Sequence, residues 1–197
     1  MILKISLARG ARGRAARAVL SLLLVLPAMP SGAAAIRVGE TLPSLQIRDL
    51  GECMLRGDDV AFEPWDSSGL GGALQLVEYV AARVTVSSIH APVYDAIESA
   101  SVPAGALVVT KLVNADDALW GTAGLVPGKV GDNKRENPDI HLVVDTAGAG
   151  LRRWQLEEGS GALALVDRDG KVLFFKEHGL TEDEIATLVR LVRERLP

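Results

Sequence analysis

The sequence predicts an α/β fold in which one mixed β-sheet is covered by helices on both faces. Apolar, β-branched runs at 74–82, 106–113 and 140–145 are separated by helical or loop segments, as parallel strands joined by crossovers are. An Asp-Gly turn at 169–170 then joins two more strands, and a helix with a clear start closes the chain. Parallel strands, an antiparallel hairpin and a closing helix together indicate a mixed sheet that is buried on both sides.

The first 35 residues have the features of a secretory signal peptide. Five basic residues and no acid accompany an apolar run from Val19 to Leu26, and small residues end the segment at Ala35. The run is too short to anchor the chain in a bilayer, and no adjacent Arg pair marks the twin-arginine route. A mitochondrial transit peptide is the alternative, but the compact apolar run and the Ala-x-Ala end favour export. We therefore expect Sec-type export with cleavage after Ala35.

The predicted mature chain, residues 36–197, is long enough for one domain with its own core. Five of the 21 Lys and Arg residues are lost with the leader. The mature chain therefore has 16 Lys and Arg residues and 25 Asp and Glu residues, which gives a formal charge of −9. This charge argues against binding to nucleic acid, whose phosphates would repel the protein. No second apolar segment is long enough to cross a membrane, so we expect no membrane span in the mature chain.

The first predicted element is a hairpin, with strands Leu45–Ile47 and Cys53–Leu55 around a turn at Asp49–Glu52. Phe62–Gly72 contains Pro, Ser and Gly and is predicted to be a loop. The nearly continuous apolar run Leu74–Ala82 predicts a strand that is buried on both faces.

A helix is expected to follow at Ile89–Ala100. Ser87 or Ser88 can cap it, and Pro92 is close enough to its start to be tolerated. The next strand is Ala106–Val113, and the cap and turn residues after it suggest a short helix within Asn114–Trp120.

The segment Gly121–Pro138 is rich in Gly and polar residues and is long for an ordinary connection, which predicts a functional loop. A strand at Ile140–Asp145 and a helical turn at Leu151–Leu156 come next. Strands at Ala162–Val166 and Lys171–Phe175 then form the hairpin around the Asp-Gly turn. A capping box at Thr181–Glu184 begins the last helix, which has its apolar residues on one face.

This order of elements resembles a thioredoxin fold of the peroxiredoxin and TlpA type. Gly39–Pro43 followed by Asp49–Gly51 is similar to the opening of those proteins, and Ala164–Ile185 is similar to their closing hairpin and helix. The resemblance implies a thioredoxin-like three-layer sandwich.

More narrowly, the chain resembles the YtfJ-type family of small exported bacterial proteins. The resemblance covers almost all of the mature chain and rests on Trp65–Ser67, Ala81–Arg83, Val113–Ala118, Asn133–Arg135 with Pro138, Trp154–Glu158 with Ser160 and Ala162, and Asp167–Val172. It implies a periplasmic protein of Gram-negative bacteria with an uncharacterised role. In Gly121–Pro138 the chain departs from this pattern, because Pro127, Gly128 and Gly131 interrupt what could be helical in relatives.

The redox groups of the thioredoxin fold are missing. Alignment to the fold puts Val84–Ser87 where Cys-x-x-Cys would be, and Ser88 where a peroxiredoxin has its reactive cysteine. Gly161 stands where the fold has its cis-proline. A serine hydroxyl cannot cycle between thiol and disulfide, so we expect the protein to be redox-inactive by the dithiol mechanism.

The former active-site cleft nevertheless gathers polar residues. If the fold is thioredoxin-like, Arg83, Thr85, Ser87, Ser88 and His90 converge on Glu158, Ser160 and Gly161. A serine nucleophile activated by His90 and Glu158 is one interpretation. Helix capping is the favoured one, because the chain has no Gly-x-Ser-x-Gly elbow.

Three further features are candidates for function. Asn114, Asp116 and Asp117 end a parallel strand on the side where open α/β sheets bind ligands, although they can simply cap the next short helix. Cys53 is the only cysteine, and we interpret it as an inert thiol, with a one-thiol redox role as the alternative. The three histidines lack metal-ligand spacing, so neither a metal site nor a cofactor is expected.

Taken together, these features predict a binding or accessory protein that is not an enzyme. Its partner would be another periplasmic protein or a small ligand, bound at the former active-site cleft or at the 121–138 loop. The alternatives are a one-thiol redox protein that uses Cys53 and, because of the histidines and the acidic charge, a metal-binding accessory protein.

Overall fold

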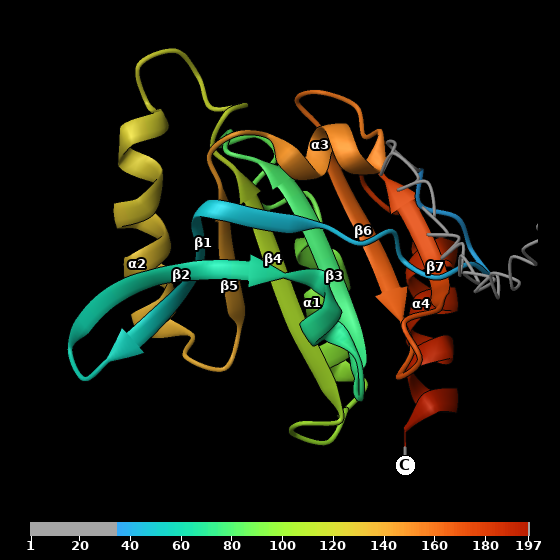
Figure 1. The fold of residues 1–197 in the computed structure, drawn as a ribbon. Helices are drawn as coiled ribbons and strands as arrows, with labels where there is room; N and C mark the ends of the chain where they lie inside the picture. The colour runs from blue at the N-terminus through green and yellow to red at the C-terminus, as the bar shows by residue number, and fades with distance from the viewer. Residues whose placement is uncertain (1–34, 197) are drawn as a thin grey trace, which may run out of the picture. The chain divides into compact units, whose positions relative to one another are not determined.

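The computed structural model describes residues 35–196, so the predicted signal peptide lies outside the described residues. Seven strands form one sheet in the order β2-β1-β5-β4-β3-β6-β7 (Figure 1). The strands are β1 (Gln46–Arg56), β2 (Asp59–Asp66), β3 (Leu74–Ala81), β4 (Leu107–Asn114), β5 (His141–Asp145), β6 (Gly161–Val166) and β7 (Val172–Glu177). The helices are α1 (Ala91–Ser99), α2 (Val126–Glu136), α3 (Ala149–Trp154) and α4 (Glu182–Arg195), with short 3-10 helices at Ser67–Leu70 and Ala123–Leu125.

The predicted mixed α/β sheet is confirmed. β3, β4 and β5 are parallel, while β1, β2, β6 and β7 pair in antiparallel fashion. In this register Ala81, Asn114 and Asp145 lie side by side. The carboxyl ends of three strands therefore meet at one edge, where the candidate site lies.

Each face of the sheet carries its own core, because side chains alternate along a strand. Leu74 and Leu76 of β3 pack with α1 and α4, whereas Val77 and Tyr79 pack with Trp154 of α3. Figure 1 shows α1 and α4 together behind the sheet and α3 near its upper edge. All eight residues of β3 are buried, as predicted for a strand covered on both faces.

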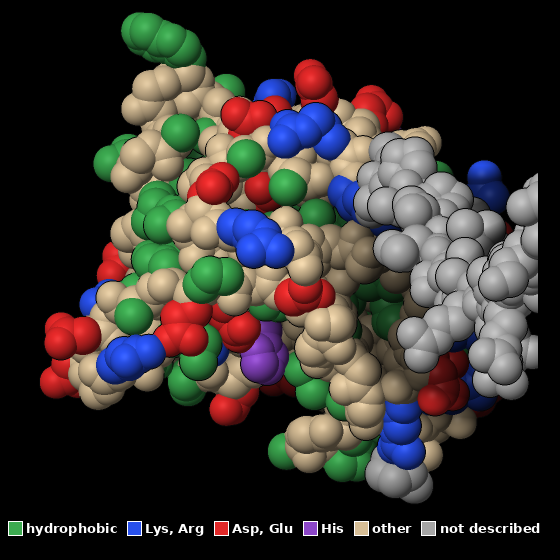
Figure 2. Space-filling model, in the orientation of Figure 1, with side chains coloured by type: hydrophobic (Ala, Val, Ile, Leu, Met, Phe, Trp, Pro, Cys, Tyr) green, Lys and Arg blue, Asp and Glu red, His purple; other side chains and the backbone are tan. Residues whose placement is uncertain are grey.

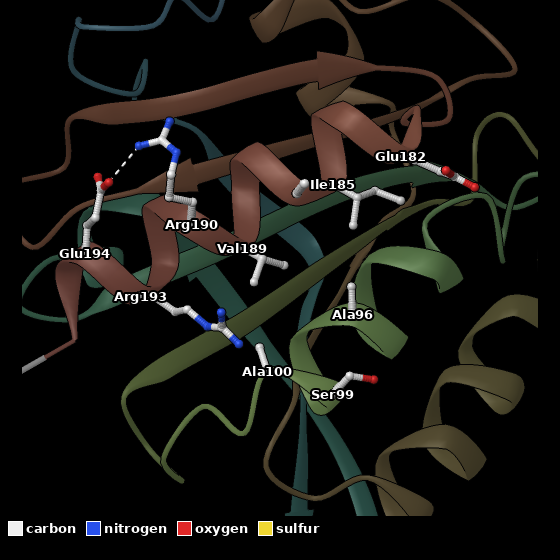
Figure 3. A pocket seen from close by; sticks show the side chains of 10 residues that line it. Ala96, Ser99, Ala100, Glu182, Ile185, Val189, Arg190, Arg193 and Glu194 are labelled. Carbon is white, nitrogen blue, oxygen red and sulfur yellow. Dashed lines mark hydrogen bonds and ion pairs between the residues drawn. The ribbon is translucent and has the colours of Figure 1, made fainter.

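A shallow groove of about 670 Å³ runs between α1 and α4. Figure 3 shows that Ala96 of α1 and Ala100, which follows this helix, face Ile185 and Val189 of α4, and the two alanines are too short to fill the space between the helices. Charged side chains of α4 border it, and Arg190 donates a hydrogen bond of 2.7 Å to Glu194.

The predicted hairpin turn at Asp49–Glu52 is wrong. β1 is one strand of 11 residues, and the turn lies at Gly57 and Asp58 before β2. The register shifts between Ile47 and Glu52, so this stretch forms a bulge and not a turn. Gly51 is required there, because its φ is +77° and any Cβ would overlap the carbonyl oxygen of Glu63.

The predicted loop Phe62–Gly72 is also partly wrong. β2 continues to Asp66, and Ser67–Leu70 forms a 3-10 helix that the Asp66 carboxylate caps by accepting from Ser68 N at 2.8 Å. The strand survives Pro64 because β2 is an edge strand, where a missing N–H is tolerated.

The predicted loop Gly121–Pro138 contains helix α2. Pro127 lies in the first turn, where it removes no helical hydrogen bond. Gly131 lets α2 approach β2 closely, since a Cβ there would lie 3.3 Å from Val60 Cγ2. The residues that suggested a break thus start the helix and allow it to pack.

Two smaller expectations also differ from the structure. Asn114–Trp120 forms bends and turns and no helix. Neither Ser87 nor Ser88 caps α1, whose N-cap is His90, and Ser87 Oγ instead donates to Val84 O at 3.1 Å.

The predicted C-terminal hairpin and helix are confirmed. β6 and β7 pair as neighbours, and the capping box is complete, because Thr181 Oγ1 accepts from Glu184 N while Glu184 accepts from Thr181 N. In the part of the chain that the structure describes, no helix combines the length and the apolar character needed to cross a bilayer.

Candidate functional site

The turn after β3 carries exposed hydroxyl groups and no thiol. Thr85, Ser87 and Ser88 are exposed, while Val86 is buried and anchors the turn. Successive backbone bonds shape it, since Val86 N and Ser87 N both donate to Arg83 O. The turn is therefore a compact structure that presents small polar groups.

Arg83 joins this turn to two other candidate segments. Its Nε donates to Asp117 O at 3.0 Å, and its Nη2 pairs with Asp117 Oδ1. The other oxygen of the same carboxylate accepts from Gly159 N. A Cβ at Gly159, where φ is +69°, would lie 2.8 Å from Arg83 Nη1. The structure thus brings together the turn, the acidic strand end and the loop before β6.

The other residues of the acidic strand end have local roles. Asn114 is buried, and its Oδ1 accepts from Asp116 N at 3.2 Å. Asp116 is exposed and lies beside Gly148. Asn114 therefore holds the backbone at the strand end, as a cap would.

His90 does not face the serines. It is fully buried, its Nδ1 lies 2.8 Å from Glu78 Oε1, and its Nε2 lies 3.0 Å from the carbonyl oxygen of His178. Both ring nitrogens are therefore within hydrogen-bond distance of an oxygen atom of the protein. No nitrogen remains to activate Ser87 or Ser88, so this geometry gives no support to a serine nucleophile.

Glu78 is the residue that sequence reasoning missed. It lies fully buried in β3, where Tyr94 Oη donates to it at 2.6 Å and Lys111 Nζ lies at 3.0 Å. Burial alone would raise the pKa of Glu78, but the hydrogen bonds from His90 and Tyr94 and the charge of Lys111 hold it below its usual value. A carboxylate inside a strand predicted to be buried on both faces was the available signal in the sequence.

The facing loop is held by its own backbone. Glu158 is exposed, and Ser160 Oγ donates to Glu157 O at 2.7 Å. A Cβ at Gly161 would lie 2.9 Å from Ile89 Cγ2 and 3.1 Å from His90 Cε1. Glycine at this position therefore lets β6 pass close to the start of α1.

A cleft of about 500 Å³ opens beside the turn, between α1 and α2. Arg83 and Ser87 line one side, and α2 with the segment before it lines the other. The other residues predicted for the former active-site cleft are not among the described residues that line it: Thr85, Ser88, His90, Glu158, Ser160 and Gly161. Its cationic residues are Arg83, Lys111 and Lys129, and there is no Asp or Glu among the described residues that line it.

Apolar side chains surround this cleft. Val84, Leu119 and Leu125 line it and are exposed, and the neighbouring Trp120 is completely exposed. Figure 2 shows hydrophobic side chains gathered over α2 and the segment before it. The cleft therefore combines an apolar wall with positive charge.

Cys53 lies in β1 beneath α2, remote from the turn. Its side chain is fully buried and packs with Val126, Val130 and Leu142. Burial raises the pKa of the Cys53 thiol, and the positive charges of Lys134 and Arg135 only partly oppose this effect.

We expect Cys53 in the folded protein to react with iodoacetamide at pH 8 at least about a hundredfold more slowly than in 6 M guanidinium, because reaction requires local opening. Mass spectrometry of quenched time points measures the rate, and Cys53→Ser corrects for modification elsewhere. Rapid labelling of the native protein at pH 7 would instead favour the one-thiol redox alternative.

The three histidines lie in different places. His90 is buried, His141 Nδ1 lies 2.5 Å from Glu52 Oε1, and His178 Nε2 lies 3.2 Å from Glu157 Oε2. Within residues 35–196, one group has ligand atoms close enough to share an ion: those of Glu157, Glu177 and His178 all lie within 4.8 Å of one another. Glu157 and His178 are exposed, so the metal-binding alternative would depend on an open surface group.

Comparison with known proteins agrees with this architecture. A family model described as "Bacterial protein of unknown function (YtfJ_HI0045)" matches residues 36–195. The uncharacterized protein YtfJ of Escherichia coli is 32% identical over 180 residues, covering 91% of this chain and 98% of that protein. An uncharacterized protein of Haemophilus influenzae is 32% identical over 157 residues, covering 80% of this chain and 85% of the relative.

Solved structures with a similar fold are thiol-dependent proteins by their names. A thiol peroxidase from Chromobacterium violaceum has a TM-score of 0.54 at 15% identity, covering 83% of this chain and 90% of its own. A putative thiol:disulfide interchange protein DsbE from Chlorobium tepidum has a TM-score of 0.51 at 13% identity, covering 82% and 99%. At these identities the likeness shows the fold alone, which is thioredoxin-like. The chain belongs to the YtfJ_HI0045 family of bacterial proteins of unknown function.

Proposed function

We propose that the protein is a redox-inert binding protein of the periplasm whose cleft between α1 and α2 holds a small anion with an apolar body. The observation that carries the proposal is the composition of this cleft, in which Arg83, Lys111 and Lys129 border an apolar wall without any lining acid. Its volume of about 500 Å³ lies in the range of small-molecule sites.

The three cations contribute unequally. Arg83 is paired with Asp117, and Lys111 is paired with the buried Glu78, so each is largely neutralised. Lys129 has no acidic partner within residues 35–196 and carries the net positive charge of the cleft. The amide groups of Asn133 and Asn137 lie on the same wall and can contribute further polar contacts. A carboxylate attached to an alkyl chain or a ring matches this arrangement.

The periplasmic part of the proposal is supported by the basic and then apolar leader that ends at Ala35. The redox-inert part is supported by the single cysteine, which is buried beneath α2 and not at the turn.

We expect the protein to bind octanoate at least about tenfold more tightly than n-octanol, because only octanoate has a carboxylate that can pair with Lys129. Lys129→Glu should weaken octanoate binding by at least about tenfold. Lys171→Glu, an exposed change in the β6–β7 turn, is the matched control and should change it by less than about twofold. Isothermal titration calorimetry measures all four combinations.

Native mass spectrometry of protein recovered from a periplasmic extract tests the proposal without a chosen probe. The expected mass is the sum of a chain that begins at Ile36 and a retained anionic compound. Equal binding of octanol and octanoate, together with an unchanged affinity in Lys129→Glu, would exclude the anion cleft.

A further inference from the structure

Exposed apolar side chains gather at the mouth of the cleft between α1 and α2. Among the described residues, six large apolar side chains are exposed, and four of them belong to this place: Val84, Leu119, Trp120 and Leu125. Val84 comes from the turn after β3, and the other three come from the segment before α2. Trp120 is completely exposed and does not line the cleft itself. We call these four residues the apolar rim.

The segment that carries most of the rim has a formed backbone. Thr122 N and Thr122 Oγ1 both donate to Leu119 O, at 2.9 and 2.7 Å, and Leu125 N donates to Thr122 O at 3.0 Å. Figure 1 shows this segment as a loop that projects beyond the start of α2. Because hydrogen bonds close its successive turns, the segment presents Trp120 to solvent in a defined position.

The rim indicates that the occupant of the cleft extends beyond it. A tryptophan buries about 150–250 Å² when it is covered, and contiguous exposed apolar patches mark interaction sites. Tryptophan is also enriched among the residues that dominate binding at protein interfaces. A ligand that only fills the cleft, about 500 Å³ in volume, would leave Trp120 in water. A larger partner would cover both.

We infer that the cleft and its rim bind the end of a polypeptide chain, whose terminal carboxylate pairs with Lys129 while its last apolar side chains cover Leu119 and Trp120. This inference rests on the proposed anion cleft and names the class of its ligand. A chain that ends in apolar residues is a carboxylate on an apolar body, and proteins do recognise peptides by capturing the terminal carboxylate. The side-chain amide of Asn133, on the same wall, can pair with the last peptide groups.

Charge complementarity favours a chain end over other surfaces that could cover the rim. Lys129 is exposed in the cleft, and none of the described residues that line the cleft is an Asp or Glu. A two-fold contact between two copies would place this positive cleft against itself. The chain from Ile36 onward has 16 Lys and Arg against 25 Asp and Glu, and this formal charge of −9 opposes adhesion to an anionic membrane surface.

The test is a titration of the full mature chain with the peptide acetyl-Gly-Ser-Gly-Leu-Phe-Leu, which has a free carboxylate. Isothermal titration calorimetry should show binding at least about tenfold tighter than that of the same peptide with a C-terminal amide. The polar peptide acetyl-Gly-Ser-Gly-Ser-Gly-Ser should also bind at least about tenfold more weakly, because it cannot cover the rim. Since Trp65 and Trp154 are buried, the long-wavelength tryptophan emission belongs to Trp120 and should shift to shorter wavelength on binding.

Variants separate the rim from the cleft. Trp120→Ala should weaken binding of the apolar peptide by at least about tenfold and leave octanoate binding within about twofold, since Trp120 does not line the cleft. Val38→Ala, an exposed apolar change outside the rim, is the matched control and should leave both within about twofold. Lys129→Glu should weaken the binding of both ligands.

The inference is overturned if octanoate binds and the apolar peptide does not, if the amide binds as tightly as the acid, or if Trp120→Ala binds the peptide normally. Failure of both octanoate and the peptide would instead overturn the anion cleft. Light scattering and co-sedimentation with phosphatidylglycerol vesicles should show a monomer that does not bind vesicles. A dimer or vesicle binding that Trp120→Ala abolishes would assign the rim to a second copy or to a membrane, and would also overturn the inference.

Discussion

Replacing Glu78 by alanine is expected to lower the free energy of unfolding by about 3–5 kcal/mol. The Glu78 carboxylate accepts from His90 at 2.8 Å and from Tyr94 at 2.6 Å, and it lies 3.0 Å from Lys111 Nζ. Removing it leaves the fully buried His90 ring without its hydrogen-bond partner and the partly buried Lys111 ammonium without its counter-charge. Urea denaturation followed by circular dichroism measures the loss.

The matched control is Glu98→Ala, which removes an exposed carboxylate from α1, the helix that carries Tyr94. It should change the free energy of unfolding by less than about 0.5 kcal/mol. Tyr94→Phe removes one of the three contacts and should cost about 1–2 kcal/mol. A loss of less than about 1 kcal/mol in Glu78→Ala would mean that the apolar packing of β3 holds this region without the polar cluster.

The same cluster gives a pH dependence with a definite sign. Because the pKa of Glu78 is lower in the folded protein than in the unfolded chain, its contribution to stability is present above the unfolded pKa, near about 4.3. The contribution is lost as the pH falls through the lower, folded pKa. Stability curves between pH 3 and pH 7 should therefore fall more steeply with acid in the native protein than in Glu78→Gln.

Sequence reasoning predicted the elements whose patterns are set locally. The strand at 74–82 and the final helix are clear, because a continuous apolar run and a capping box each have one interpretation. It went wrong where glycine and proline have two uses. Gly51 forms a bulge in β1, Pro127 lies in the first turn of α2, and Gly131 lets α2 pack closely on β2. Only the neighbouring β2 distinguishes these roles from a turn.

The contact between Arg83 and Asp117 joins two of the segments that the sequence offered as candidates. The turn at 83–88 and the strand end at Asp117 do come together, since both follow parallel strands that end at one edge. The buried partner of His90 could not be predicted, because the pairing of Glu78 with α1 depends on the rotation of that helix over the sheet. The cleft between α1 and α2 could not be predicted either, since it is lined by elements far apart in the chain.

Replacing Asp145 by alanine is expected to cost about 3–4 kcal/mol of unfolding free energy, because three donors lose their acceptor at once. Asp145 is fully buried at the end of β5. Its Oδ1 accepts from Ala149 N at 2.9 Å, and its Oδ2 accepts from Gly150 N and Tyr79 Oη, both at 2.8 Å. The carboxylate therefore fixes the start of α3 to the sheet.

Tyr79 extends this connection, since its hydroxyl also accepts from Leu151 N at 3.0 Å and its ring meets Trp154 edge to face at 5.9 Å. Burial and the neighbouring Asp145 carboxylate raise the pKa of Tyr79, so the phenol stays protonated and able to donate. Tyr79→Phe alone should cost about 1–2 kcal/mol, and the exposed Asp139→Ala less than about 0.5 kcal/mol. The double variant of Asp145 and Tyr79 should lose less than the two single losses together, because both remove the same hydrogen bond. Additive losses would mean that the two side chains act separately and that packing of Trp154 is what holds α3 on the sheet.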